Sequence, residues 1–210
     1  MEVYKMRRNQ KILRMVEMAM LIALVVVLQM ISALIPPIAG LVSITLTLVP
    51  VVVGAILFGK KGGAVLGFTF GLIVLINCIS GLDIGGNILW NANPLLTALI
   101  CFAKGIAAGF VPAVLYEAIR GKKEQVSNGK KYAAAMVAAL SSPIVNTGLF
   151  VCGMLLFFMD TLYAWAGGTN VASYILLGLA GLNFLVEFLI NIILTPAIVR
   201  IVEVVKKKIN

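Results

Sequence analysis

The sequence contains no histidine, and only 12% of its 210 residues carry a charge. Soluble domains are about 25% charged. The missing histidine excludes Ser/His proteases and most zinc-dependent intramembrane proteases. No GxxxxGK[ST] stretch is present, which excludes ATP binding through a P-loop. No pair of carboxylates resembles an aspartyl dyad. We therefore expect neither an enzyme nor a chain with its own catalytic residues, metal or cofactor.

Cysteine is also scarce, with three residues and no CxxC spacing. Cys78, Cys101 and Cys152 each lie in or at the end of an apolar run. We expect all three to be small buried hydrophobic residues rather than metal ligands or disulfide partners.

Hydrophobic residues, by contrast, make up 61% of the chain, and the mean hydropathy is +1.08. A helix needs about 20 apolar residues to cross the hydrocarbon core of a bilayer. The chain predicts one membrane domain over residues 1–210, an all-α bundle of six transmembrane helices. The expected spans are 15–35, 44–58, 62–79, 94–119, 132–159 and 172–199. The second is the shortest and contains Pro50.

The net charge of +9 is explained by topology. Sixteen of the 17 Lys and Arg residues lie in the N-terminal segment, at 60–61, at 120–131 and in the C-terminal tail. Segments 36–43, 80–93 and 160–171 contain none. Because cytoplasmic segments carry the Lys/Arg excess, both termini are predicted to be cytoplasmic in a multi-pass protein of the cell membrane. The basic charge is thus no sign of nucleic-acid binding.

One basic residue, Lys104, falls inside the fourth span. A lysine at mid-membrane costs at least ~2.5–3.5 kcal/mol on insertion scales. Asn146 and Glu187 lie at similar depth in the fifth and sixth spans, and Asn183 shares the helix face of Glu187. These residues predict a polar ligand site between the last three spans. An ion pair between Lys104 and Glu187 that only joins the helices is the alternative, and the sequence does not decide between them.

A second set of candidate ligand contacts lies in segment 80–93, on the predicted outer side. Three amides and one indole, with three glycines nearby, suit a loop that covers a polar ligand: Asn87, Trp90, Asn91 and Asn93. Trp165, on the same side, is expected to belong to the aromatic belt of the membrane surface.

Small residues form stripes along three of the spans. Gly63, Gly67 and Gly71 recur every fourth residue, as do Gly105 and Gly109. Such stripes allow helices to approach closely, and packing inside the bundle is the expectation for them. Ala19 and Ala23 form a similar pair in the first span.

Three stretches, together with the size and topology, resemble the S-components of energy-coupling factor (ECF) vitamin transporters. They are the Ala-xxx-Ala segment 18–23, residues 44–59 followed by 62–67, and residues 143–148. The likeness covers nearly the whole chain. It implies a six-helix protein that binds a vitamin near the outer face, in a pocket built from the later helices and capped by the outer loops.

The resemblance also implies partners. An S-component docks through its first helices onto a membrane T-component, which assigns the docking surface here to Ala19 and Ala23. Two cytosolic ATPases use the ATP, so this chain would need no cofactor of its own. The expected location is a bacterial plasma membrane. An autonomous secondary carrier for a small metabolite and a non-transport structural membrane protein are the competing hypotheses.

Pantothenate is the favoured substrate and riboflavin the second. Pantothenate has one carboxylate, which Lys104 would balance, and hydroxyls that asparagine amides would bind. Riboflavin needs a flat aromatic slot, and the sequence offers few aromatic residues there beyond Phe184 and Phe188.

Overall fold

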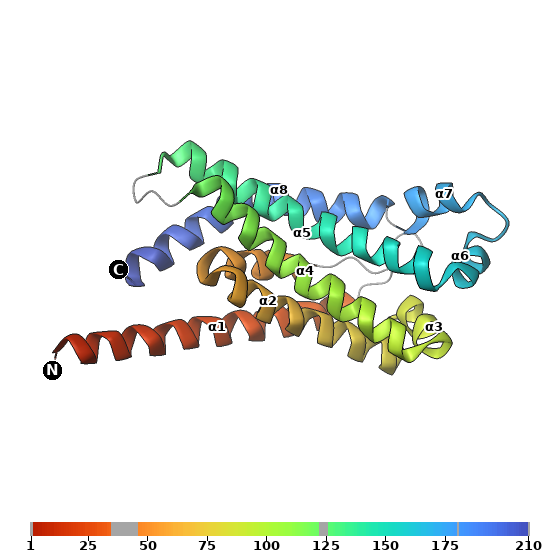
Figure 1. Ribbon diagram of the computed structural model, residues 1–210, viewed down its shortest axis with the longest axis horizontal. Coiled ribbons are helices and arrows are strands. Elements are labelled where there is room, and N and C mark those ends of the chain that lie inside the picture. Colours follow the sequence, from red (N-terminus) through yellow and green to blue (C-terminus); the bar gives the residue numbers. More distant parts are fainter. Residues whose placement is uncertain (1, 35–45, 122–125, 180, 210) are drawn as a thin grey trace.

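The computed structural model describes residues 2–34, 46–121, 126–179 and 181–209, except for the side chains of 2–9, 179, 182, 183 and 206–209 (Figure 1). Within these residues every regular element is a helix, which confirms the predicted all-α class. The elements are α1 Glu2–Leu34, α2 Leu48–Ser80, α3 Ile84–Ala92, α4 Pro94–Arg120, α5 Asn128–Phe157, α6 Met159–Ala166, α7 Val171–Tyr174, the π-helical turn Ile175–Leu179, and α8 Gly181–Ile209.

The long helices run side by side, and the short ones gather at one end (Figure 1). We call the end that carries α3, α6 and α7 the cap end. The N- and C-termini, the last turn of α4 and the first turn of α5 lie at the opposite end, the termini end. Among the described residues, five helical segments are long and apolar enough to cross a membrane: Gln10–Ala33, Leu48–Ser80, Pro94–Arg120, Asn128–Phe157 and Phe184–Val205.

The count of five differs from the predicted six because the second and third predicted spans both fall in α2. Gly59 breaks this helix with φ +68° and ψ −162°, a backbone conformation that only glycine adopts readily. The break coincides with the predicted boundary at 59–62. Residues 48–58 form an arm of about 16 Å at 1.5 Å per residue, which is short for a bilayer core of ~30 Å. Residues 44 and 45 of the second predicted span lie outside the described residues.

Two other expectations were wrong in detail. The last span was placed at 172–199, but 172–179 belong to α7 and the π-helical turn, and α8 begins at Gly181. Segment 80–93 was expected to be a loop, yet most of it is α3. The Asp83 carboxylate caps this helix by accepting a hydrogen bond from the Gly86 N–H (3.0 Å). Two glycines in its first turn give α3 a low helix propensity. The sequence therefore did not indicate a helix in this segment.

The glycine stripes of α2 and α4 pack inside the bundle, as predicted, and the structure shows that they face each other. A Cβ atom added at Gly67 would collide with the carbonyl oxygen of Gly105, and one at Gly63 with that of Gly109. The reciprocal additions on α4 would also strike the backbone of α2. The two helices therefore touch backbone to backbone, and this contact fixes the position of α4 and of Lys104 relative to α2.

The close contact between α2 and α4 predicts that one added methyl group on α4 lowers the stability of the protein. Gly105→Ala is expected to lower the stability of the purified protein by about 1–3 kcal/mol, because the backbones must separate to admit the Cβ. Gly148→Ala is the matched control, since Gly148 is also inside a long helix but has no neighbour within 4 Å. Thermal unfolding in detergent measures both. Equal melting temperatures for the two variants would contradict the close contact.

Candidate functional site

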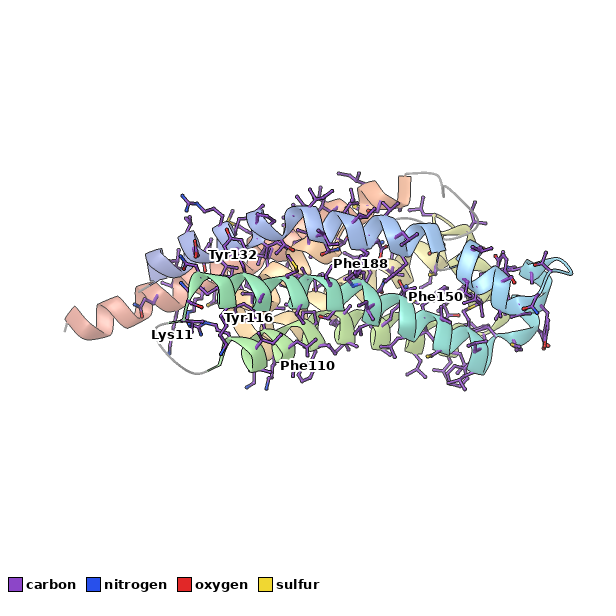
Figure 2. The ribbon with its side chains drawn as sticks, turned by 90° about the horizontal axis from the view of Figure 1, so that it is seen from above. Lys11, Phe110, Tyr116, Tyr132, Phe150 and Phe188 are labelled. Carbon is purple, nitrogen blue, oxygen red and sulfur yellow. The ribbon has the colours of Figure 1, made fainter. Side chains whose placement is uncertain are left out.

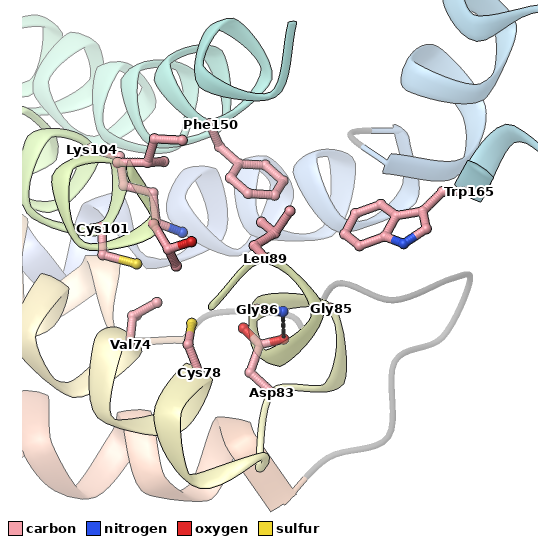
Figure 3. A pocket seen from close by; sticks show the side chains of 12 residues that line it. Val74, Cys78, Asp83, Gly85, Gly86, Leu89, Cys101, Lys104, Phe150 and Trp165 are labelled. Carbon is pink, nitrogen blue, oxygen red and sulfur yellow. Dashed lines mark hydrogen bonds between the residues drawn. The ribbon is translucent and has the colours of Figure 1, made fainter. Parts of the chain in front are cut away.

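A cavity of about 40 Å³ lies between α2, α4 and α5 near the cap end (Figure 3). Its walls come from the cap-end halves of these helices and from α3 and α6, which cover it. The lining residues are Val74, Cys78, Asp83, Gly85, Gly86, Leu89, Thr97, Ile100, Cys101, Lys104, Phe150 and Trp165. Most of them are apolar, and a few polar groups converge on the same space, a composition typical of small-molecule sites.

Lys104 supplies the positive charge of the cavity. Its Nζ atom lies 5.0 Å from the ring centroid of Phe150, which places the ammonium against the face of an aromatic ring on α5. Such a cation–π contact partly compensates for the loss of hydration. The structure describes both Lys104 and Glu187 and shows no ion pair between them. Glu187 is not among the residues that line this cavity, and the alternative in which the two residues only join helices stays a prediction.

One ion pair among the described residues lies at the termini end. Lys60 Nζ is 3.3 Å from Glu117 Oε2, and both side chains are about half exposed. An exposed pair of this kind contributes about 0–1 kcal/mol. It is structurally separate from the cavity.

The opposite charge in the cavity belongs to Asp83. Its carboxylate caps α3 and lines the cavity at the same time (Figure 3). A Cβ at Gly86 would strike the Cys78 sulfur and approach the Asp83 carboxylate, so glycine is required where α3 folds onto the end of α2. The cavity thus presents an ammonium and a carboxylate to the same small space.

Trp165, on α6, closes the cavity from the cap end. It packs against an apolar cluster formed by the ends of α4 and α5 with α3 and α6, which includes Leu89, Met154 and Leu162. Tyr174 packs on the same cluster, and burial raises the pKa of its phenol. Trp165 was expected only as a membrane-belt residue, but here it is part of the site.

The predicted amides of segment 80–93 hold the cap together. Asn87 donates to the Cys78 carbonyl (2.8 Å), and Asn91 donates to the Asn87 side-chain oxygen (3.0 Å). Asn93 caps α4 by accepting from the Leu96 N–H (3.1 Å). Trp90 packs against the core between α2 and α4. None of these four predicted contact residues lines the cavity, so their contact with a substrate stays a prediction.

A second set of buried polar residues lies on α5 and α8, outside the cavity lining. Its members on α8 are Glu187, Asn191 and Thr195, with exposures of 4%, 1% and 0%, and Asn146 on α5 is 7% exposed. Asn191 donates to the Glu187 carbonyl (2.8 Å), and Thr195 donates to the Asn191 carbonyl (2.7 Å). Asn146 and Glu187 do not line the cavity. Asn183 lies in α8, but its side chain is outside the described residues.

Sequence reasoning found Lys104 but missed Asp83, Thr97, Phe150 and Trp165. Asp83 carried a usable signal, because it precedes a short run with a glycine pair and can cap a helix. Phe150 carried none, since an aromatic residue in a membrane helix is ordinary. Of the three cysteines, Cys78 and Cys101 are buried as expected and line the cavity, whereas Cys152 is exposed.

Comparison with known proteins adds to this geometry. Residues 13–199 match the family model described as "ECF transporter, substrate-specific component". The chain is also 28% identical over 183 residues to the pantothenic acid transporter PanT of Lactococcus lactis subsp. cremoris. That alignment covers 87% of this chain and 89% of the relative.

Proposed function

Because the chain belongs to the family of substrate-specific components of ECF transporters, we propose that it captures a carboxylate-bearing vitamin, with pantothenate favoured. The observation that carries this proposal is Lys104, a partly buried lysine whose ammonium lines a cavity covered by α3 and α6. A carboxylate is the natural partner for such a charge. The relative's printed name, a pantothenic acid transporter, supports the same choice.

The polar groups of the site fit the rest of pantothenate. Its carboxylate would approach Lys104, and its hydroxyls and amide N–H would donate to acceptors such as Asp83 or the predicted contacts Asn146, Asn183 and Glu187. Asn87, Trp90, Asn91 and Asn93 would act from the cap, by positioning α3 over the bound ligand. The enclosed 40 Å³ is smaller than the ~300–1,000 Å³ of typical ligand pockets, so binding would expand the site.

Riboflavin is the second candidate because two aromatic rings line the cavity. Phe150 and Trp165 could flank a flat ring system, and Phe184 and Phe188 form a tilted pair on α8 with ring centroids 5.4 Å apart. Riboflavin carries no carboxylate, however, and would leave Lys104 without a partner. Calorimetric titration of the purified chain with each vitamin separates them, and tighter binding of riboflavin would reverse the ranking.

We further propose that the cap end faces outward and both termini face the cytoplasm of a bacterial cell, with the short arm of α2 completing a six-helix topology. The exposed basic residues at the termini end support this orientation. Ala19 and Ala23, both exposed on α1, would dock onto a membrane T-component, and two cytosolic ATPases would supply the energy.

Transport assays distinguish this function from its competitors. Proteoliposomes that contain the chain alone are expected to accumulate no pantothenate. Addition of the T-component, both ATPases and internal ATP is expected to produce uptake. Uptake by the chain alone, without ATP, would instead identify an autonomous carrier. Absence of ligand binding and of uptake in every combination would favour a structural membrane protein.

A further inference from the structure

A second cavity, of about 470 Å³, lies at the termini end, and the proposed vitamin site does not use it. We call it the termini cavity. Residues 55–57 line it from the first arm of α2, and Tyr116, Glu117 and Arg120 line it from the end of α4. Figure 2 shows Tyr116 toward the termini end of the bundle, whereas Phe150 of the first cavity lies toward the cap end. The two cavities share no lining residue and are separate.

The length of α4 places the termini cavity at the level of the lipid headgroups. This helix has 27 residues. At 1.5 Å per residue it is about 40 Å long, whereas the hydrocarbon core of a bilayer is ~30 Å thick. A helix of this length that crosses the core symmetrically extends beyond it by about 5 Å, or one turn, at each end. At the termini end that turn contains Glu117 and Arg120, so both side chains lie at the membrane surface.

Two basic side chains at the termini cavity form no ion pair within the described parts of the chain. Arg120 lines the cavity, and Lys130, at the start of α5, has its Nζ atom 4.0 Å from a Cβ added at the lining residue Gly121. The carboxylate of Glu117, in the same lining, is paired with Lys60. Guanidinium and ammonium groups are the usual partners of phosphate oxygens in proteins. The cavity therefore has a charge that suits an anion.

The α2 side of the termini cavity is apolar and lies deeper in the membrane. The first arm folds back along the rest of α2, since a Cβ added at Gly63 would approach the Ala55 side chain. Because the arm reaches the termini end at the Gly59 break, residues 55–57 lie on the bilayer side of that break. Ile56, one of them, packs on the apolar cluster of the bundle. Basic groups at the surface and an apolar wall below them match an amphipathic molecule.

From this arrangement we infer that the termini cavity binds the headgroup of an anionic phospholipid. The phosphodiester pairs with Arg120 and Lys130, and the glycerol and first acyl carbons lie against residues 55–57. A volume of about 470 Å³ is within the ~300–1,000 Å³ of typical ligand pockets. Basic pockets between membrane helices at a bilayer surface are sites for such headgroups. The lipid would join the short arm of α2 to α4 and α5, independently of any vitamin in the first cavity.

Native mass spectrometry of the purified, delipidated full chain tests this site with two lipids that have the same acyl chains. Phosphatidylglycerol is the anionic probe, and phosphatidylcholine is the zwitterionic one. One phosphatidylglycerol per chain is expected to bind more tightly than phosphatidylcholine. Arg120→Gln is expected to weaken this binding about tenfold, through the loss of a charge-assisted hydrogen bond. Arg200→Gln, at an exposed arginine on α8 outside the cavity lining, is the matched control and should leave it unchanged.

The outcomes distinguish a lipid from other ligands. Equal binding of the two lipids, or phosphatidylglycerol binding that is unchanged in Arg120→Gln, would overturn the inference. A large excess of glycerol phosphate, which has the same phosphate but no acyl chains, is expected not to displace the lipid. Displacement would identify a site for a soluble phosphate and would also overturn it. Should Arg120→Gln not fold, Lys130→Gln, at an exposed position, replaces it with the same expected loss.

Discussion

Lys104→Met is expected to weaken pantothenate binding by about 100-fold while leaving the purified protein folded. The ammonium is the cationic group among the residues that line the cavity. Loss of a hydrogen-bonded charge partner for a ligand carboxylate in a poorly hydrated site costs on the order of 3 kcal/mol. Met keeps the length and apolar stem of the side chain, so packing against Phe150 is largely preserved. Titration calorimetry measures the loss.

The melting temperature of the same variant distinguishes a role of Lys104 in ligand binding from a role in stability alone. A lysine inside a membrane helix costs ~2.5–3.5 kcal/mol on insertion scales, so its removal is expected to leave stability unchanged or higher. Lys61→Met, at an exposed position two residues after the Gly59 break and outside the cavity lining, is the control and should affect neither property. A strongly lowered melting temperature in Lys104→Met, with undiminished affinity, would assign Lys104 a purely structural role.

The second large effect concerns transport rather than binding. Ala23→Phe is expected to reduce ATP-driven uptake at least tenfold and to leave pantothenate affinity unchanged. Ala19 and Ala23 lie on an exposed stripe of α1, away from the cavity. A small-residue stripe allows a partner helix to approach closely, and a phenyl ring there would hold the helices apart.

Uptake and binding must be measured on the same preparation to make this test selective. Ile144→Phe is the matched control, because Ile144 is exposed on α5, a helix not assigned to docking. It should reduce neither uptake nor binding. Full uptake by Ala23→Phe in the assembled transporter would contradict the assignment of the docking surface to this stripe.

Much of the helical framework was predictable because hydropathy and small-residue spacing are local properties of the chain. The break at Gly59 coincides with a predicted span boundary, and the internal packing of the glycine stripes followed from their spacing, although which stripe meets which did not. The start of α8 could not, because residues 172–180 are as apolar as a span. Hydropathy cannot tell a short helix at the cap end from the first turns of a membrane helix.

The candidate site was only partly predictable for a different reason. Lys104 stands out because charge is rare inside spans, and its depth matched that of Asn146 and Glu187. Depth alone, however, does not say which helix faces meet. The structure puts Lys104 in the cavity with Trp165, while Glu187 is buried on α8 outside the cavity lining. The arrangement of faces depends on the α2–α4 contact and on the cap, both of which are tertiary features.

The central claim is that this chain alone binds a carboxylate-bearing vitamin through Lys104. Native mass spectrometry of the purified chain, released gently from detergent, tests it most directly. The account predicts one bound small acid per chain, identified as pantothenate after release and absent from the Lys104→Met variant. A chain that carries no small molecule after incubation with pantothenate, or one that retains a ligand equally well in Lys104→Met, would contradict it.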